Sequence, residues 1–332
     1  MPRPYQETVW KDPFSRTRGR AVGVRGLNFA AKPPRSRPSL PSTGARGPSA
    51  RIQIPAPEDT AMNQRLLDDI EEVVARATYA PYLLLCLDFD GTLVAIAESP
   101  DQVHLEPETR NLIADLALRP DITTAIISGR NRADLQSLIS IPGLIYAGNH
   151  GLEISGPGFV FVEPTALACR EALQALAAEL TARLTGIPGA FVEDKGLTLS
   201  VHDRKVPAER LDEVRRLVHA VLANSAHPFH MMAGDRIYDI RPRVPWDKGV
   251  AVHWIRKQIG RPDALVIYLG DDATDEDAFV GLQDDVTIKV RSGGETVARY
   301  RLESVNDVQQ FLRRLASLRS DRAEAYSGHG PP

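Results

Sequence analysis

A short apolar run that ends in two carboxylates constrains this chain more than any other feature. Residues 83–87 read Leu-Leu-Leu-Cys-Leu, and residues 88–93 read Asp-Phe-Asp-Gly-Thr-Leu. Such a run, bounded by Asp and Gly, predicts a buried strand of a parallel sheet that is covered on both faces. Ligands of these sheets bind at the carboxyl ends of the strands, so Asp88 and Asp90 are expected at the mouth of a site.

The pair Asp88 and Asp90 favours chemistry on a phosphate group. Two neighbouring carboxylates do not ionise easily side by side unless a cation compensates them, and ligands that offer only oxygen favour Mg²⁺. An isolated Asp-x-Asp would as often form a turn or cap a helix. Here the predicted strand before the pair and the Gly-Thr-Leu after it favour the functional interpretation.

A second predicted strand ends in groups that suit a phosphate. Residues 123–127 read Thr-Thr-Ala-Ile-Ile, and Ser128, Gly129 and Arg130 follow them before a helical pattern over 131–139. A hydroxyl and free backbone N–H groups at a strand-to-helix turn can hold phosphate oxygens. Taken alone, Ser-Gly-Arg would only mark a turn.

A third predicted strand, residues 264–269, leads into an acidic stretch with five carboxylates at 271–277. These carboxylates would repel one another without a counter-charge. We therefore predict Asp271 as a direct Mg²⁺ ligand, with Asp272 and Asp275 as a second ligand or in the outer shell.

Lys248 is a candidate for that counter-charge. It belongs to the Trp-Asp-Lys-Gly at 246–249, which precedes a helical pattern over 250–259. A lysine at a helix start is unfavourable beside the macrodipole, so an anionic neighbour is expected. Alone, Lys248 would be interpreted as an ordinary solvated lysine.

These four segments, in this order, resemble the four motifs of the haloacid-dehalogenase-like phosphatases. The resemblance implies that Asp88 is a nucleophile that forms an aspartyl-phosphate, and that Asp90 is a general acid and base. It implies that Ser128 and Lys248 hold the phosphoryl oxygens. It also implies that Mg²⁺ is held by Asp88, the backbone carbonyl of Asp90 and Asp271.

A second unit is predicted to interrupt this core. After the Gly-Asn-His-Gly at 148–151, the pattern changes to short alternating strands such as 158–162 and 197–201, with amphipathic helices at about 165–184 and 207–223. This pattern is typical of an α+β insertion. We therefore predict an α/β protein: a doubly wound, Rossmann-like parallel-sheet core with an inserted α+β domain. The resemblance to the phosphatases implies that the core is a hydrolase core and that the insertion is a cap domain that selects the leaving group.

The predicted division of the chain has four parts. They are a basic tail rich in Pro and Arg at 1–60, a catalytic core at 61–151 and 241–320, the cap at 152–240, and a disordered tail at 321–332. The first predicted helix is 62–75. Residues 1–60 carry few acids and no periodicity, so we predict disorder, and we favour a dispensable tail over a targeting segment or a weak anion-binding segment.

The predicted cap has its own polar cluster. Residues 192–196 read Val-Glu-Asp-Lys-Gly, and Ser200, His202 and Arg204 would share one face of a strand of period two. The pattern alone also fits a strand with one wet face. Together with the Gly-Asn-His-Gly, however, the cluster resembles the trehalose-6-phosphate phosphatases, and this resemblance covers about residues 65–318.

The second resemblance implies a set of substrate contacts. They are Arg130, His150, Glu193, Lys195, His202, Arg204, Asp239 and Arg241, with the two histidines as the weaker candidates. This chain departs from the family pattern at Asp239, where Glu is usual, and at Trp246, where a small or polar residue is common. The segment from the strand at 238–242 to Lys248 is also slightly longer than the family pattern. These departures concern the sugar contacts and not the phosphatase chemistry.

Composition limits the classes of protein that fit. The chain has 332 residues, 43% of them hydrophobic, enough for one or two sizeable cores. A net charge of −3 argues against a general nucleic-acid binder, and no apolar run approaches the roughly 18 to 20 residues of a membrane span. Cys86 and Cys169 are far apart, which favours a reducing compartment and predicts a cytoplasmic location.

The implied function is Mg²⁺-dependent hydrolysis of trehalose 6-phosphate to trehalose and inorganic phosphate, the last step of trehalose biosynthesis. Functional coupling to a trehalose-phosphate synthase is the implied partnership, with no nucleic acid or membrane partner. Three alternatives stay open. They are a sucrose-phosphate or mannosyl-phosphoglycerate phosphatase of the same superfamily, a phosphomutase, and a non-catalytic sugar-phosphate sensor.

Overall fold

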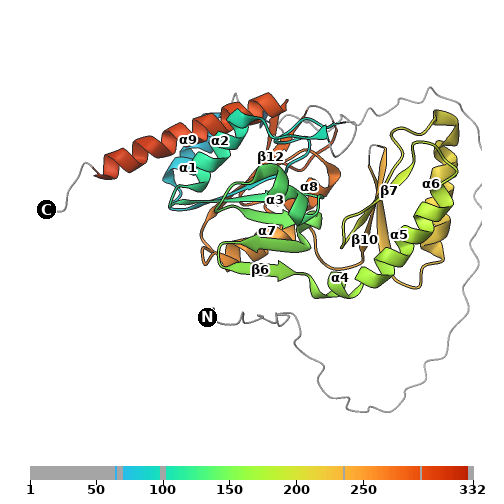
Figure 1. Ribbon diagram of the computed structural model, residues 1–332. Coiled ribbons are helices and arrows are strands. Elements are labelled where there is room, and N and C mark those ends of the chain that lie inside the picture. The colour runs from blue at the N-terminus through green and yellow to red at the C-terminus, as the bar shows by residue number, and fades with distance from the viewer. Residues whose placement is uncertain (1–63, 66–69, 98–101, 235, 292–293, 328–332) are drawn as a thin grey trace, which may run out of the picture. The chain divides into compact units, whose positions relative to one another are not determined.

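The computed structural model describes residues 64–65, 70–97, 102–234, 236–291 and 294–327, and two sheets organise them (Figure 1). The tail predicted at 1–60 lies outside these residues. The larger sheet has nine strands, in the spatial order β1 (Gln64–Arg65), β13 (Tyr300–Leu302), β12 (Val286–Val290), β11 (Leu265–Gly270), β2 (Leu83–Leu87), β3 (Ile122–Ile127), β4 (Ile145–Gly148), β5 (Glu153–Gly156) and β6 (Phe159–Val162). From β1 to β4 every neighbouring pair is parallel.

Helices cover both faces of this sheet, which confirms the predicted α/β fold class. One face packs against α1 (Ile70–Tyr79), α2 (Pro107–Ala117), α3 (Arg132–Ile139) and α9 (Val305–Ser327), and the other against α7 (Lys248–Gln258) and α8 (Ala273–Gly281). Alternate side chains of β2 enter the two layers: Leu85 faces the first and Cys86 the second. Because both faces are covered, all five residues of β2 are buried, which explains its continuous apolar run.

The second sheet lies within the predicted insertion except for the last two residues of one strand, which extends to Pro242. It contains β7 (Phe191–Asp194), β8 (Leu199–His202), β10 (Ile237–Pro242) and β9 (Phe229–Gly234), in that order and all antiparallel. The helices α5 (Arg170–Leu184) and α6 (Leu211–Ala223) pack on one of its faces (Figure 1). Short helices, α4 (Pro164–Ala168) and η3 (Ala208–Arg210), precede them. The other face carries the polar side chains described below.

The strand predicted at 158–162 belongs to the larger sheet and not to the insertion. The turn η2 (Asn149–Gly151) reverses the chain after β4, so β5 and β6 extend that sheet as antiparallel strands. On β6, the Phe161 ring contacts Trp246 and Trp254 at centroid distances of 4.8 and 4.7 Å. An alternating pattern predicts a strand but does not tell which sheet the strand joins.

Two further predictions need correction at the ends of the described chain. The helix predicted over 62–75 is instead the strand β1 followed by α1, because Gln64 and Arg65 pair with β13. The tail predicted from 321 is helical as far as Ser327, since good helix formers continue without Gly or Pro until Gly328.

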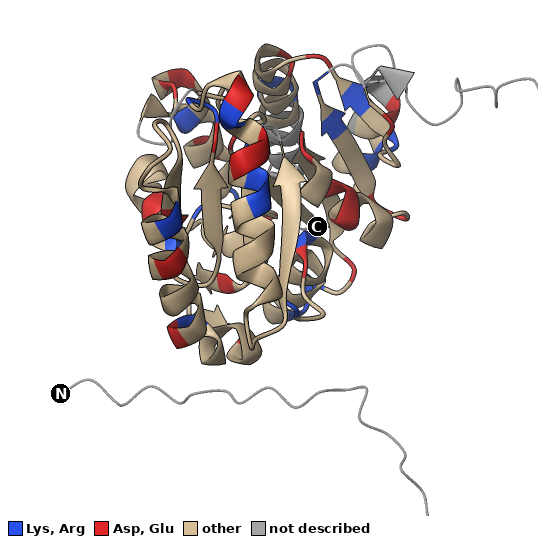
Figure 2. Cartoon of the chain, turned by 90° about the vertical axis from the view of Figure 1, so that its right-hand side faces the viewer, with Lys and Arg blue, Asp and Glu red and all other residues tan. Residues whose placement is uncertain are grey.

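Figure 2 shows where the charged residues stand along the chain. Among the residues that the structure describes, basic and acidic positions are interspersed along the helices. In the same part of the chain, none of the helices combines the length and the hydrophobicity that a membrane crossing needs.

Candidate active site

The three most buried acids of the predicted motifs lie together at the carboxyl edge of the larger sheet. Asp88 follows β2 and Asp271 follows the neighbouring β11, and the Asp88 N–H donates to Leu269 O at 2.9 Å. Asp275, on the first turn of α8, completes the group. One carboxylate oxygen of each acid lies within 4.8 Å of the others.

Lys248 is buried among these acids. Its Nζ donates to Asp88 Oδ1 at 2.8 Å and to Asp275 Oδ1 at 2.7 Å, and its side chain is only 1% exposed. Burial alone would lower the pKa of Lys248, but the carboxylates of Asp275 and Asp88 raise it well above its usual range. The anionic neighbour expected for a lysine at a helix start is therefore present.

One lysine does not compensate three buried carboxylates. Burial raises the pKa of Asp88 well above its usual range, despite the opposite effect of Lys248. Burial also raises the pKa of Asp271 to about 6 and that of Asp275 to about 7. Groups that are hard to ionise together in this way favour a bound cation.

The local geometry suits a small, hard cation. All three side chains offer oxygen, the ligand type that Mg²⁺ prefers. Gly91 has a φ of +83°, and a Cβ at this position would overlap the Asp271 carboxylate. A glycine is therefore required for the loop after Asp90 to approach Asp271 so closely.

Asp272 has a structural task at the same edge. Its Oδ1 accepts from the N–H groups of Thr274 and Asp275, at 2.8 and 3.1 Å, and Asp275 Oδ2 accepts from the Asp272 N–H at 3.0 Å. This reciprocal capping box starts α8 and turns the Asp275 carboxylate toward Lys248. The Asp272 side chain is half-exposed, and its Oδ1 lies 3.9 Å from Lys248 Nζ.

Asp90 and Ser128 both contact Arg130, in the turn that follows β3. Arg130 holds Asp90 through two hydrogen bonds, from Nε to Oδ2 at 2.7 Å and from Nη2 to Oδ1 at 2.8 Å. Ser128 is buried directly after β3, and its Oγ accepts from the Arg130 N–H at 3.2 Å. The Ser-Gly-Arg turn therefore orients the second Asp of the first motif.

Two residues contact the acids without having been predicted. Tyr268 is fully buried in β11, and its hydroxyl donates to Asp275 Oδ1 at 2.7 Å. Arg291, just beyond β12, lies 3.2 Å from Asp271 Oδ2. The polar end of Tyr268 in an otherwise apolar run was the available signal. Arg291 could have been found only from the strand order, which puts β12 beside β11.

The predicted sugar contacts from the second sheet mostly share its polar face. Glu193, Ser200 and Asp239 are cross-strand partners on β7, β8 and β10. Glu193 Oε2 lies 2.8 Å from His202 Nε2, and Ser200 Oγ donates to Asp239 Oδ1 at 2.5 Å. Lys195 Nζ lies 3.6 Å from the same Asp239 oxygen.

Of the remaining predicted contacts, Arg241 is buried on β10 two residues after Asp239, so it lies on the same face of the sheet, and it contacts Met232. Arg204 is placed differently: it is exposed in a turn, because β8 already ends at His202. Arg204 therefore does not share the strand face predicted for it. His150 is buried, and among the described residues neither of its ring nitrogens has a hydrogen-bond partner. Burial, with a smaller effect of Arg241, lowers the pKa of His150 to about 3.

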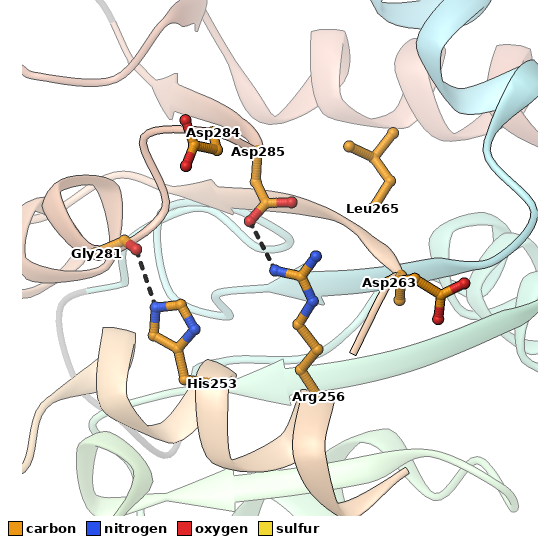
Figure 3. Close-up of a pocket in the computed structure, with 8 residues that line it drawn as sticks. His253, Arg256, Asp263, Leu265, Gly281, Asp284 and Asp285 are labelled. Carbon is orange, nitrogen blue, oxygen red and sulfur yellow. Dashed lines mark hydrogen bonds and ion pairs between the residues drawn. The ribbon is translucent and has the colours of Figure 1, made fainter. Parts of the chain in front are cut away.

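A hollow of about 360 Å³ lies away from all of these residues (Figure 3). It is at the amino end of β11, near Asp263 and Leu265, and therefore at the opposite edge of the sheet from Asp271. Arg256 faces Asp285 across it at 3.1 Å, and His253 Nε2 lies 2.9 Å from Gly281 O. These contacts connect α7 to the neighbouring segments.

A mostly parallel sheet with buried acids and a lysine at its carboxyl edge, beside a second α+β unit, is the arrangement expected for a phosphatase of the haloacid-dehalogenase-like class. The family model of the trehalose-phosphatases matches residues 86–306. The chain belongs to the trehalose-phosphatase family, and it is thus an enzyme of the phosphoric monoester hydrolase class.

Individual relatives agree with this assignment. A probable trehalose-phosphate phosphatase E of Arabidopsis thaliana is 34% identical over 276 residues, which cover 78% of this chain and 77% of that protein. The trehalose-phosphate phosphatase of Mycobacterium tuberculosis is 38% identical over 239 residues, 69% of this chain, and the match spans 60% of that relative. The structure of the C. albicans trehalose-6-phosphate phosphatase C-terminal domain has a TM-score of 0.65 at 20% identity, covers 78% of this chain and 99% of that one, and shows the shared fold.

Proposed function

We propose that this chain hydrolyses trehalose 6-phosphate to trehalose and inorganic phosphate. The observation that carries the proposal is the buried contact of Lys248 with Asp88, beside Asp271, at the carboxyl edge of the sheet. Membership of the trehalose-phosphatase family supports the choice of sugar. The reaction would complete trehalose biosynthesis, with a trehalose-phosphate synthase as the source of its substrate and a cytoplasmic location.

The proposed mechanism has two half-reactions on one nucleophile. Oδ1 of Asp88 accepts from Lys248, so we assign Oδ2 to in-line attack on phosphorus. The bond from phosphorus to the sugar oxygen breaks, and Asp90, as the general acid, gives a proton to that oxygen. Water then attacks the aspartyl-phosphate and gives a proton to Asp90, which releases phosphate and restores Asp88. Ser128 and Lys248 hold phosphoryl oxygens throughout.

The acids are proposed to hold Mg²⁺. Asp88, Asp271 and the backbone carbonyl of Asp90 would be direct ligands, and Asp275 and Asp272 would be a further ligand or lie in the outer shell. When bound, Mg²⁺ neutralises negative charge on the phosphoryl oxygens. The oxygen-only donor set and the raised pKa values of Asp271 and Asp275 support this assignment.

The proposed cation site predicts a pH-dependent effect of Mg²⁺ on stability. The folded-state pKa values of Asp271 and Asp275, about 6 and about 7, exceed those of unfolded carboxyls, so the folded protein binds more protons. These groups therefore cost the metal-free protein stability as the pH rises from about 4 to about 7. Mg²⁺ competes with those protons. Relative to EDTA, we expect Mg²⁺ to raise Tm by about 3–6 °C near pH 8 and by about 1 °C or less near pH 5.

Thermal unfolding by circular dichroism at both pH values measures this effect. Asp271→Asn should lose most of the increase near pH 8. Asp263→Asn, which changes an exposed acid at the opposite edge of the sheet, should keep it. An equal Mg²⁺ effect at the two pH values would contradict the proposed site.

The proposed substrate is tested by phosphate release from trehalose 6-phosphate, sucrose 6-phosphate, glucose 6-phosphate and p-nitrophenyl phosphate, with Mg²⁺ and with EDTA. A strong Mg²⁺-dependent preference for trehalose 6-phosphate is expected. Equal, weak hydrolysis of all four compounds would support the phosphatase activity but would contradict trehalose 6-phosphate as the specific substrate. Release of no phosphate would favour the sensor, and transfer of phosphate to another sugar would favour the mutase.

We propose that the insertion at 152–240 contains a cap that selects the sugar. The strands β5 and β6 are not part of this cap, because they belong to the larger sheet. The proposal is supported by the polar face that Glu193, His202 and Asp239 share opposite α5 and α6. Arg130, His150, Lys195, Arg204 and Arg241 remain in the proposed set of substrate contacts.

Lys195→Met should separate sugar recognition from chemistry. A charge-assisted hydrogen bond contributes about 1.5–3 kcal/mol, so kcat/KM for trehalose 6-phosphate should fall by about 10- to 100-fold. Hydrolysis of p-nitrophenyl phosphate should change by less than about twofold, because a small ester does not reach the cap. Lys205→Met, the same change at an exposed lysine of the same unit, is the control. Equal losses on both substrates would argue against a sugar contact.

A further inference from the structure

Asn149 links the larger sheet to the second unit through every polar atom of its side chain. It is fully buried directly after β4. Its Nδ2 donates to Lys195 O at 3.0 Å and to Glu153 Oε1 at 2.6 Å, and its Oδ1 accepts from Thr198 Oγ1 at 2.5 Å. The carbonyl and the carboxylate can only accept, so these partners fix which way the amide points.

The two partners in the second unit are the ends of one turn. This turn, residues 195–198, connects β7 to β8, and the Lys195 N–H donates to Thr198 O at 3.0 Å across it. Thr198 is buried, with 1% exposure. Because Asn149 binds both ends, it holds the turn, and with it the Lys195 backbone, in a fixed place on the larger sheet.

The backbone at Asn149 is itself held in an unusual conformation. Asn149 and His150 have φ values of +50° and +59°, in the left-handed region, which few residues other than Gly adopt and which Asn tolerates better than most. The N–H of Asn149 donates to Arg130 O at 2.7 Å, and that of His150 donates to Ser128 O at 2.9 Å. The Ser-Gly-Arg turn thus orients both Asp90, through the Arg130 guanidinium, and the Asn149 amide.

We propose that Asn149 is a positioning residue for the phosphatase reaction. It acts through the turn 195–198 and sets where Lys195 stands relative to the acids at the carboxyl edge. This inference rests on the proposed function, in which Lys195 contacts the sugar. A misplacement of about 1 Å at such a contact costs up to about 100-fold in rate, so loss of the Asn149 contacts should affect the sugar phosphate and not a small ester.

Three variants isolate the contact. Asn149→Gly removes the amide and keeps the left-handed backbone, which Gly adopts freely. Thr198→Val removes the hydroxyl at nearly constant shape, and Thr198→Ser retains it. We expect Asn149→Gly and Thr198→Val to lower kcat/KM for trehalose 6-phosphate by about 10- to 100-fold and to change that for p-nitrophenyl phosphate by less than about twofold. Thr198→Ser should remain near the unmodified enzyme.

A second measurement does not depend on the substrate. Hydrogen–deuterium exchange of the Lys195 amide, followed in the full chain, should accelerate in Asn149→Gly and in Thr198→Val, because the turn loses its support. Equal losses on both esters, or unchanged exchange, would overturn the positioning role. If the unmodified enzyme shows no preference for trehalose 6-phosphate, the proposed substrate fails, and the exchange of the Lys195 amide alone then decides whether Asn149 holds the turn.

Discussion

Asp88→Asn is expected to abolish phosphate release, with a loss of at least about 10⁴-fold in kcat. The amide cannot attack phosphorus to form the acyl phosphate, and Asp88 is the acid that Lys248 contacts at 2.8 Å. The fold should survive this change. It removes one of three buried carboxylates whose pKa values are raised, so repulsion within the cluster decreases.

Two measurements separate the chemical effect from a folding effect. Steady-state phosphate release gives the loss in kcat, and thermal unfolding without metal should give a Tm equal to or above that of the unmodified enzyme. Asp263→Asn makes the same change at an exposed acid on the opposite edge of the sheet and should alter neither. An Asp88→Asn enzyme that retains most of its turnover would exclude Asp88 as the nucleophile.

The gathering of acids at the carboxyl edge of the larger sheet could be predicted from the sequence because its signals are local. A buried strand of the larger sheet is recognised in the sequence as a continuous apolar run. Because these strands are parallel, the polar residues that follow them lie at the carboxyl edge of the sheet. This reasoning located Asp88, Ser128 and Asp271 without knowledge of the strand order. Lys248 needed one further step, since its position at a helix start predicts an anionic partner but does not tell which one.

What sequence reasoning missed depends on contacts between distant segments. In the sequence, Tyr268 is one more residue of an apolar strand, and only the structure shows that its hydroxyl donates to Asp275. The alternating pattern of β6 would be the same whether the strand joined the second sheet or extended the larger one. Its place in the larger sheet depends on distant contacts, such as those of Phe161 with Trp246 and Trp254. Arg204 does not lie on the strand face predicted for it, because β8 ends at His202 and is shorter than the alternating pattern suggests.

Lys248→Met should impair both activity and stability. It removes the cation that contacts Asp88, the proposed nucleophile, so kcat should fall by about 10²- to 10³-fold. It also leaves Asp88 and Asp275 buried without their shared partner, which typically costs about 3–5 kcal/mol in the free energy of unfolding. The two effects have one origin, since the contacts that would place Asp88 for the proposed attack also compensate the charge of the cluster.

The sign of the pH dependence distinguishes this explanation from a simple packing defect. Burial already raises the pKa of Asp275 to about 7, and without Lys248 the pKa values of Asp275 and Asp88 should rise further. The folded variant would then take up protons at low pH, so the loss of stability should be smaller near pH 5 than near pH 8. Denaturant unfolding at both pH values measures the difference, with Lys257→Met, an exposed lysine at the other end of α7, as the control.

A double variant tests the coupling directly. Adding Asp275→Asn to Lys248→Met removes the second unpaired charge, so it should recover more stability near pH 8 than the same substitution does in the unmodified protein, where Asp275 still has Lys248 as a partner. Additive effects would mean that the lysine and the acid act independently. They would remove the argument that this edge of the sheet is built around a shared charge.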